Sequence, residues 1–240
     1  MPWYRNMSVL SGAGEKLKNT ARRLLPKNRF ARSVSVLAGG TAAGQIIIVA
    51  ASPILTRLYS PEDFGVLAVF ASSLGILGVI ASLRYQLAIP LPDTDEEAAN
   101  VTVLSLVVVM GMALLTAAIA IPFRQPIAEA LNTPVLDDYI WLLPLGLLLM
   151  GIYQVFNFWA IRAKAYTTIA RTKLTQSLSM VVVQVLGYTL GPLALLLGRV
   201  LGQAAGMTTL GSLALVKRRQ AFRNVTSSSV CKASVRYYSF

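Results

Sequence analysis

One arginine stands inside a long apolar stretch of the sequence and is the first candidate for chemistry. Arg199 and Gln203 are four residues apart in the stretch 193–216, so they lie on one face of a helix. Placing an arginine at the centre of a bilayer costs at least about 2.5 kcal/mol, and such residues often contact a charged substrate. The alternative is that the guanidinium snorkels to the nearer membrane surface, about 9 Å away along the helix. Both interpretations stay open at this point.

Neutral polar side chains form a second group of candidates. They occupy the same kind of apolar stretch and are Gln45, Gln154, Asn157 and Gln184. Taken singly, each is explained by an interhelical hydrogen bond worth about 1 kcal/mol. Taken together with Arg199 and Gln203, they give four apolar stretches a polar face, which favours a hydrophilic cavity in the interior of a helix bundle.

The residue types that usually carry catalysis or bind metals are scarce. The chain has no histidine and one cysteine, Cys231, so an intrachain disulfide is excluded. No Asp or Glu lies in an apolar stretch, which leaves no evident site for a coupling cation. The acidic cluster at residues 93–97 is interpreted as the capped start of a helix rather than as a metal or nucleotide site. We therefore predict no catalytic residue, no metal site and no cofactor.

Three glycines recur every four residues in the stretch that holds Arg199. Gly198, Gly202 and Gly206 would form a smooth ridge along one helix face, where a second helix can approach closely. The ridge predicts tight helix packing and turns the adjoining face, with Arg199, towards the interior of the bundle.

The elements that must position these residues are membrane-spanning helices. The chain has 240 residues, of which 55% are hydrophobic and 13% are charged, whereas soluble domains average about 25% charged residues. Apolar stretches of roughly 20 residues are long enough to cross a bilayer as helices. We expect an all-α polytopic bundle with six transmembrane helices, near 34–56, 64–83, 101–121, 139–159, 174–190 and 193–216.

Two short polar interruptions define the helix ends most clearly. In the run Pro53 to Gly65, Ser60 is a plausible N-cap and Pro61 suits the first helical turn. Gly191 and Pro192 break the last apolar block, which as one helix would be about 65 Å long, far more than a bilayer needs.

The charges predict how the chain is oriented. The net charge is +12, and 19 of the 22 Lys and Arg residues lie in the leader 1–33, the connections 84–100 and 160–173, and the tail 217–240. With six spans these four segments share one side, and the other side holds only Arg57 and Arg124. The positive-inside rule places both termini in the cytoplasm, with the basic segments near anionic lipids. The basic residues flank spans, so nucleic-acid binding is not expected. The leader is either a solvated tail or a helix on the membrane surface.

The ordered motifs along the spans resemble one known family. They are L-T-R-L-Y-S-P-E-D-F-G (55–65), R-Y-Q-L-A-I-P-L-P (84–92), D-E-E-A-A-N (95–100), Y-Q-V-F-N-F-W-A-I-R (153–162) and A-R-T-K-L-T-Q-S (170–177). They resemble the polysaccharide-exporting flippases of the multidrug/oligosaccharidyl-lipid/polysaccharide exporter superfamily. The resemblance covers roughly 34–216.

The resemblance implies a fold of two six-helix lobes around a cationic cavity. It implies a transporter, not an enzyme, which moves an oligosaccharide on undecaprenyl pyrophosphate across the bacterial inner membrane by alternating access. O-antigen, capsule and exopolysaccharide assembly use such substrates. Arg199 is the one residue carried over, by its place facing the presumed cavity. The chain resembles one lobe only, so we expect it to need a second transporter lobe or other polysaccharide-assembly proteins.

Three other functions remain open from the sequence. A drug or cation antiporter of the same superfamily is disfavoured by the missing carboxylates within the spans. A membrane glycosyltransferase or polymerase would have to rely on the 93–97 cluster. A non-transporting remnant of a longer protein is the last alternative.

Overall fold

A computed structural model describes residues 29–215 of the chain. The expected basic tail 217–240, and the expected leader up to residue 28, lie outside the described residues. Residues 29–33, the end of the expected leader, belong to helix α2.

Six long helices make up the described part of the chain, and each corresponds to one expected span. They are α2 (Arg29–Leu58), α3 (Pro61–Ile80), α4 (Asp95–Ala120), α6 (Leu142–Arg162), α7 (Tyr166–Leu186) and α8 (Pro192–Leu215). The connections contain the short helix α5 (Arg124–Ala130) and three 3-10 helices, η1 (Tyr85–Ala88), η2 (Pro134–Tyr139) and η3 (Tyr188–Leu190). The described residues form no strand, so the all-α prediction is confirmed.

The turn between α2 and α3 has the predicted helix cap. The Asp63 N–H donates to the Ser60 hydroxyl at 3.2 Å, and the Ser60 N–H donates to the Asp63 carboxylate at 3.0 Å. Pro61 occupies the first turn of α3, where its missing N–H costs nothing. This reciprocal capping box fixes where α2 ends and α3 begins.

The acidic cluster also caps a helix, as its sequence indicated. The Thr94 hydroxyl accepts a hydrogen bond from the Glu97 N–H at 3.2 Å, and α4 starts at Asp95. Asp95, Glu96 and Glu97 form the first turn, where the helix dipole stabilises negative charge.

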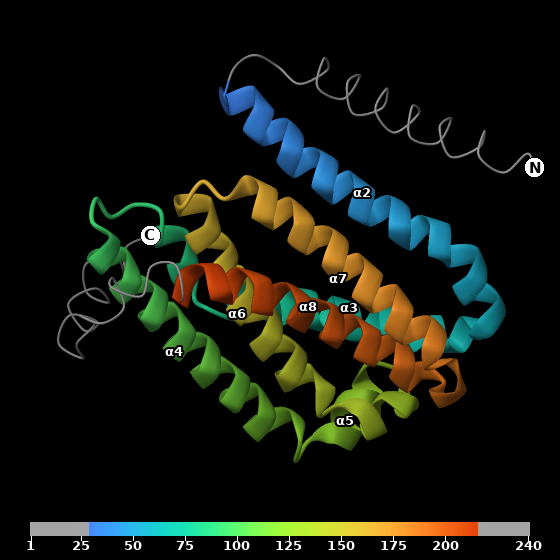
Figure 1. The fold of residues 1–240 in the computed structure, drawn as a ribbon. Helices are drawn as coiled ribbons and strands as arrows, with labels where there is room; N and C mark the ends of the chain where they lie inside the picture. The colour runs from blue at the N-terminus through green and yellow to red at the C-terminus, as the bar shows by residue number, and fades with distance from the viewer. Residues whose placement is uncertain (1–28, 216–240) are drawn as a thin grey trace, which may run out of the picture.

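The helices alternate in direction and pack in the order α2, α7, α8, α6, α4, with α3 against α6 and α8 (Figure 1). We call the end where α4 and α7 begin and α6 finishes the basic end of the bundle. The opposite end holds the α2–α3 turn and the α7–α8 turn. The order of the helices in space thus differs from their order in the sequence: α7 lies between α2 and α8.

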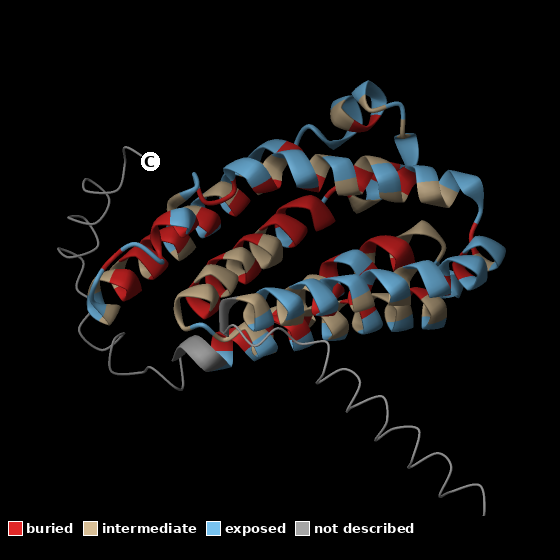
Figure 2. Cartoon of the chain, turned by 90° about the horizontal axis from the view of Figure 1, so that it is seen from above, coloured by how far each residue is buried: buried red, intermediate tan, exposed pale blue. Residues whose placement is uncertain are grey.

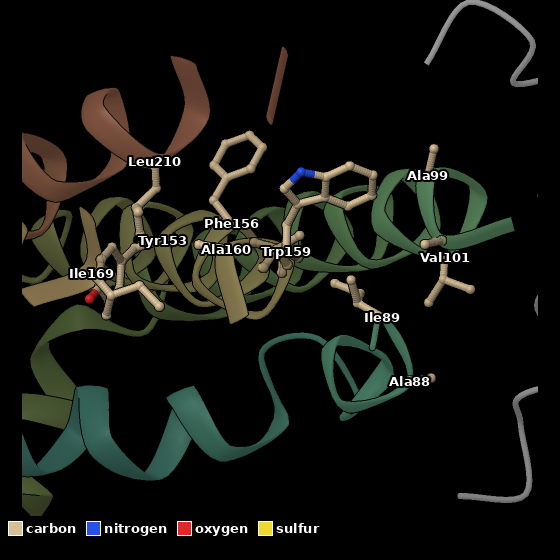
Figure 3. Packing of buried hydrophobic residues seen from close by; sticks show 13 residues of the cluster. Ala88, Ile89, Ala99, Val101, Tyr153, Phe156, Trp159, Ala160, Ile169 and Leu210 are labelled. Atoms are coloured by element: carbon tan, nitrogen blue, oxygen red, sulfur yellow. The ribbon is translucent and has the colours of Figure 1, made fainter. Parts of the chain in front are cut away.

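The main core lies near the basic end, where α6 contributes its aromatic residues (Figure 3). Trp159 is 1% exposed and belongs to the same cluster as Ile169 of α7 and Leu210 of α8. Ile89, next to η1, joins the same cluster. A second core near the opposite end centres on residues of α3, α6, α8 and η2, namely Phe70, Leu136, Leu142, Leu147, Leu196 and Val200.

The outside of the bundle is apolar. Figure 2 shows exposed residues running along the helices from one end of the bundle to the other. Many of them are large hydrophobic residues, among them Ile46, Val49, Ile76, Leu114 and Leu186. Such a surface needs lipid or another protein around it, because exposed apolar patches of this extent are unfavourable in water.

Five helices in the described part of the chain are long and apolar enough to cross a membrane: α2, α3, α4, α6 and α8. Helix α7 is not among them, although it has 21 residues and lies between α2 and α8. One face of α7 remains exposed along its length, with Leu178, Val182 and Leu186 on it. The sequence predicted a span at 174–190 after a polar connection at 160–173. In the structure the helix begins at Tyr166 and α6 ends at Arg162, so that only residues 163–165 of the expected connection are not helical.

Candidate functional site

Polar side chains gather on one stripe of α7. They are Lys173, Gln176 and Ser177, and the apolar Met180 follows on the same face of the helix, three residues after Ser177. This stripe lies between α2 on one side and α8 on the other, because α7 contacts both helices along its length.

The stripe lines a cavity of about 240 Å³ among α2, α7 and α8. Gln45 and Ile48 come from α2, and Arg199, Gly202 and Gln203 come from α8. Three of the residues expected to line a cavity, Arg199, Gln203 and Gln45, therefore meet in one place. No Asp or Glu is among the described residues that line it.

Two cations reach this cavity from opposite ends of the bundle. Lys173 is seven residues after the first residue of α7, about 10 Å from the basic end. Arg199 is seven residues after the first residue of α8, about 10 Å from the opposite end. The amides of Gln176 and Gln203 contact each other between them, with Nε2 of Gln176 3.4 Å from Oε1 of Gln203. The cavity thus carries two positive charges separated by an amide pair.

Tyr153 supports Lys173 from α6. The Lys173 Nζ lies 5.0 Å from the centre of the Tyr153 ring, within range of a cation–π interaction. Tyr153 itself is 5% exposed, and its hydroxyl has no hydrogen-bond partner within the described residues. The ring therefore holds the ammonium group beside the cavity without neutralising its charge.

Lys173 was missed by the sequence interpretation, which placed it in a polar connection and made Arg199 the single charged residue well inside a span. That expectation was wrong, because α7 begins earlier and carries Lys173 into the bundle. The spacing of Lys173, Gln176, Ser177 and Met180 was the available signal, since it repeats with the period of a helix.

The other three expected cavity residues do not line this cavity. Gln184 is 2% exposed, and its side chain donates to the carbonyl of Leu195 at 3.1 Å. Gln154 accepts from Gln86 at 3.4 Å, which ties α6 to η1. Asn157 is half-buried on α6, and its Oδ1 atom has no partner within the described residues. Gln184 and Gln154 thus make the interhelical contacts that were the alternative explanation.

The three predicted glycines do form the contact between α8 and α7. A Cβ atom at Gly198 would lie 2.5 Å from the Gln184 side chain, and one at Gly206 would lie 2.5 Å from Gln176. At Gly202 it would lie 3.2 Å from the backbone carbonyl of Gln176. The ridge brings α8 close enough to α7 for Gln203 to contact Gln176.

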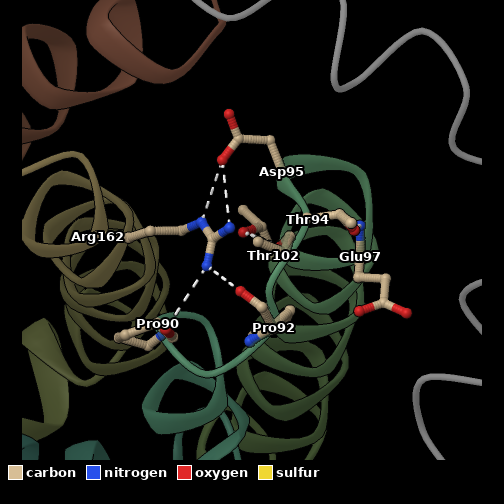
Figure 4. A network of polar contacts seen from close by, with 8 residues as sticks. Pro90, Pro92, Thr94, Asp95, Glu97, Thr102 and Arg162 are labelled. Atoms are coloured by element: carbon tan, nitrogen blue, oxygen red, sulfur yellow. Dashed lines mark hydrogen bonds and ion pairs between the residues drawn. The ribbon is translucent and has the colours of Figure 1, made fainter.

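A second cavity, of about 410 Å³, opens at the basic end. Arg162, at the end of α6, closes one side of it: its Nε and Nη2 atoms lie 3.3 Å and 3.2 Å from the Asp95 carboxylate (Figure 4). The same guanidinium donates to the carbonyls of Pro90 and Pro92. Arg162 thereby clamps the loop before α4 onto α6. Among the described residues, no group of His, Cys, Asp or Glu is placed to hold a metal ion.

Comparison with known proteins identified one family. A family model described as polysaccharide biosynthesis protein matches residues 54–237. The match includes every long helix except most of α2, and it includes both cations of the first cavity. No curated protein and no solved structure matched the chain.

Proposed function

Because the chain belongs to the polysaccharide biosynthesis protein family, we propose that it forms part of a transporter that flips a lipid-linked oligosaccharide across the bacterial inner membrane. The substrate would be carried on undecaprenyl pyrophosphate, as the sequence motifs imply. The observation that carries this proposal is the cavity that Lys173 and Arg199 both line, because no carboxylate is among its described lining residues.

Two cations in such a cavity favour the binding of an anion. Each charged side chain placed in a bilayer is unfavourable by at least about 2.5 kcal/mol. Lys173 and Arg199 also repel each other, and none of the described lining residues offers a compensating negative charge. A pyrophosphate relieves both penalties when it enters, and the amides of Gln45, Gln176 and Gln203 can donate further hydrogen bonds to it.

The placement of the cations along the bundle suggests how the anion moves. Lys173 lies nearer the basic end and Arg199 nearer the opposite end, with the amide pair between them. A pyrophosphate that enters from the basic end meets Lys173 first and is passed to Arg199. Binding at either cation must stay weak enough for release, which the hydrated setting of a polar cavity provides.

The proposal includes an orientation in the membrane, with the basic end and both termini in the cytoplasm. Among the described residues, Arg32, Arg84, Arg162 and Lys164 lie at the basic end, where they can also contact anionic lipids, whereas Arg57 and Arg124 lie at the opposite end. Alkaline phosphatase fused after residues 60, 130 or 191 should be active, and fusions after 92, 167 or 222 inactive. Activity at 92 or 167 would contradict this orientation.

The cavity also needs a partner surface. Arg199 and Gln45 line it and are nevertheless exposed in the described structure. Exposed polar groups facing hydrocarbon are unfavourable, so we propose that a second transporter lobe or another polysaccharide-assembly protein covers them. Native mass spectrometry of the chain extracted from its own membrane should show a complex. A single chain that transports without any partner would refute this part of the proposal.

Neutral variants of the two cations test the function directly. In a strain whose surface polysaccharide depends on this chain, Lys173→Gln or Arg199→Gln should strongly reduce export, whereas Arg199→Lys should retain part of it because the charge remains. Arg171→Gln is the matched control, since Arg171 is exposed on the same helix two residues from Lys173 and does not line the cavity.

Surface polysaccharide is measured by gel electrophoresis, with membrane abundance measured alongside. Full export by both Gln variants at normal abundance would show that the cavity does not contact the pyrophosphate. Equal losses in the Arg171→Gln control would mean that any loss of charge on α7 impairs the chain, and the cavity would then lose its special role.

A further inference from the structure

The cavity at the basic end has a lining unlike that of the first cavity. It combines aromatic rings, proline rings, carboxylates and cations: Pro90, Pro92, Asp93, Asp95, Trp159, Arg162, Lys164 and Tyr166 are among its lining residues. Its volume of about 410 Å³ is within the range of small-molecule sites. The ion pair of Asp95 with Arg162 keeps its wall in place, while Asp93 and Lys164 stand exposed at its rim.

The two cavities lie in line along α7. Tyr166 lines the cavity at the basic end, and Lys173 lines the first cavity. They are seven residues apart, so they share nearly the same face of the helix and are about 10 Å apart along its axis. This distance is short enough for one molecule to contact both residues. The buried side chains of Ile169 and Ala170 lie between the two cavities on this face, so a molecule that occupies both requires α7 and its neighbours to separate there.

The mixture of side chains suits a carbohydrate. Carboxylates such as those of Asp93 and Asp95 accept hydrogen bonds from sugar hydroxyls, and the cations of Arg162 and Lys164 donate to ring and hydroxyl oxygens. Aromatic side chains such as Tyr166 offer an apolar surface for the C–H groups of a sugar ring together with a polar tip. Two carboxylates in the lining disfavour a free phosphate or another simple anion.

We propose that this cavity is a sugar-binding subsite, which holds the first sugars of the glycan while the pyrophosphate lies at Lys173. This inference rests on the proposed function, because it assigns to the substrate a second contact beyond its phosphates. It divides the recognition of the substrate between two places. The first cavity recognises the negative charge of the pyrophosphate, which every such lipid carrier has, and the second cavity recognises the glycan.

Binding of free disaccharides tests the subsite with the purified full-length chain. A background with Trp3→Phe and Trp141→Phe leaves Trp159, which lines the cavity, as the single tryptophan reporter. The probes are three disaccharides, built from neutral hexoses, from N-acetylhexosamines and from hexuronates, with inorganic pyrophosphate as a separate probe. At least one disaccharide should change Trp159 fluorescence in a saturable manner.

Variants then locate the binding. Asp93→Asn should weaken disaccharide binding roughly tenfold, as expected for loss of a hydrogen bond to a charged group, without changing pyrophosphate binding. Asp93 is exposed, so the fold should tolerate this change. Glu96→Gln is the matched control, because Glu96 belongs to the same acidic turn and does not line the cavity. Lys173→Gln should weaken pyrophosphate binding and leave disaccharide binding intact.

The results separate this inference from the proposed function. Pyrophosphate binding that depends on Lys173, with no binding of any disaccharide, would overturn the sugar subsite and leave the proposed function standing. Disaccharide binding that Asp93→Asn and Glu96→Gln reduce equally would also overturn it. Saturable binding of glycerophosphoethanolamine with no disaccharide binding would assign the cavity to a zwitterionic lipid headgroup instead. Absence of binding by every probe would refute both proposals.

Discussion

Two neighbouring glycines on α2 should respond in opposite ways to the same small substitution. A Cβ atom added at Gly40 would lie 2.5 Å from the Ala170 Cβ and 2.6 Å from the Ala170 Cα, so α2 and α7 would have to separate. A Cβ atom at Gly39 meets nothing within 4 Å. Overpacking a helix contact costs about 1–3 kcal/mol, whereas glycine to alanine in an open helix position stabilises by up to about 1 kcal/mol.

Comparing the two variants isolates the free energy that the close contact of α2 with α7 contributes. Gly39→Ala and Gly40→Ala change the same residue type one position apart, so the gain in helix propensity cancels between them. The difference in free energy of unfolding should therefore be about 1–3 kcal/mol, with Gly40→Ala the less stable variant. Since α2 carries Gln45 into the first cavity, export should fall with Gly40→Ala as well.

Thermal unfolding of both variants in detergent, followed by circular dichroism, gives the comparison. Export is measured in cells at matched membrane abundance. If Gly40→Ala is as stable as Gly39→Ala, α2 does not pack closely on Ala170 of α7, and Gln45 of α2 does not line the cavity as inferred. A loss of export in both variants would show that this part of α2 matters for a reason other than its contact with α7.

Two further predictions concern the contacts that join the ends of the helices. Tyr59→Phe removes the hydrogen bond from the Tyr59 hydroxyl to the carbonyl of Gln184 and should destabilise the chain by about 1 kcal/mol. Burial, and to a smaller extent the charge of Asp63, raise the pKa of Tyr59 above 10.0. The stabilisation by this hydrogen bond should therefore be complete below about pH 10 and be lost as the pH rises further. A destabilisation by Tyr59→Phe that fades near neutral pH would contradict this. Arg162→Lys should lower the melting temperature, because an ammonium group cannot hold Asp95 with two nitrogens while also donating to Pro92; an unchanged melting temperature would mean that the clamp does not stabilise the bundle.

Several features of the fold could be predicted because they depend on local sequence. Ser60 and Asp63 lie at the spacing of a capping box, and Pro61 follows the cap directly. Gly191 adopts a φ of +58°, a conformation that favours glycine, immediately before α8 begins at Pro192. Such signals need only neighbouring residues, so the number and order of the six long helices within residues 29–215 follow from the sequence.

The helix neighbours were predictable only in part. The glycine ridge of α8 was recognised as a packing surface, but its partner could not be identified from spacing alone. Gly40 and Gly44 of α2 have the same small-residue spacing, and a Cβ atom added at them would clash with Ala170 and Ser177 of α7. That α7 lies between these two glycine-bearing helices is a property of the three-dimensional arrangement.

The candidate site was harder to predict because hydropathy measures each helix as if lipid surrounded it. Lys173 and Gln176 make α7 too polar to be recognised as a span along its full length, yet they face α2 and α8, and the exposed face of the helix carries Leu178, Val182 and Leu186. Gln184 and Gln154 were candidates by type but bond to neighbouring elements. A polar side chain is left to line a cavity only when no neighbouring element offers it a hydrogen bond, and this depends on the three-dimensional arrangement.

The position of α7 between α2 and α8 has a consequence for how the protein is made. Translocon-mediated insertion tests each emerging segment for its affinity to lipid, and α7 by itself falls short of the other long helices. Its polar stripe becomes tolerable only when α2 and α8 lie against it, and α8 follows after a short turn. We therefore expect α7 and α8 to insert together as a hairpin, beside an α2 that is already inserted in the bilayer. A released chain that ends directly after α7 should leave that helix outside the bilayer, whereas a released chain that ends after α8 should embed both helices.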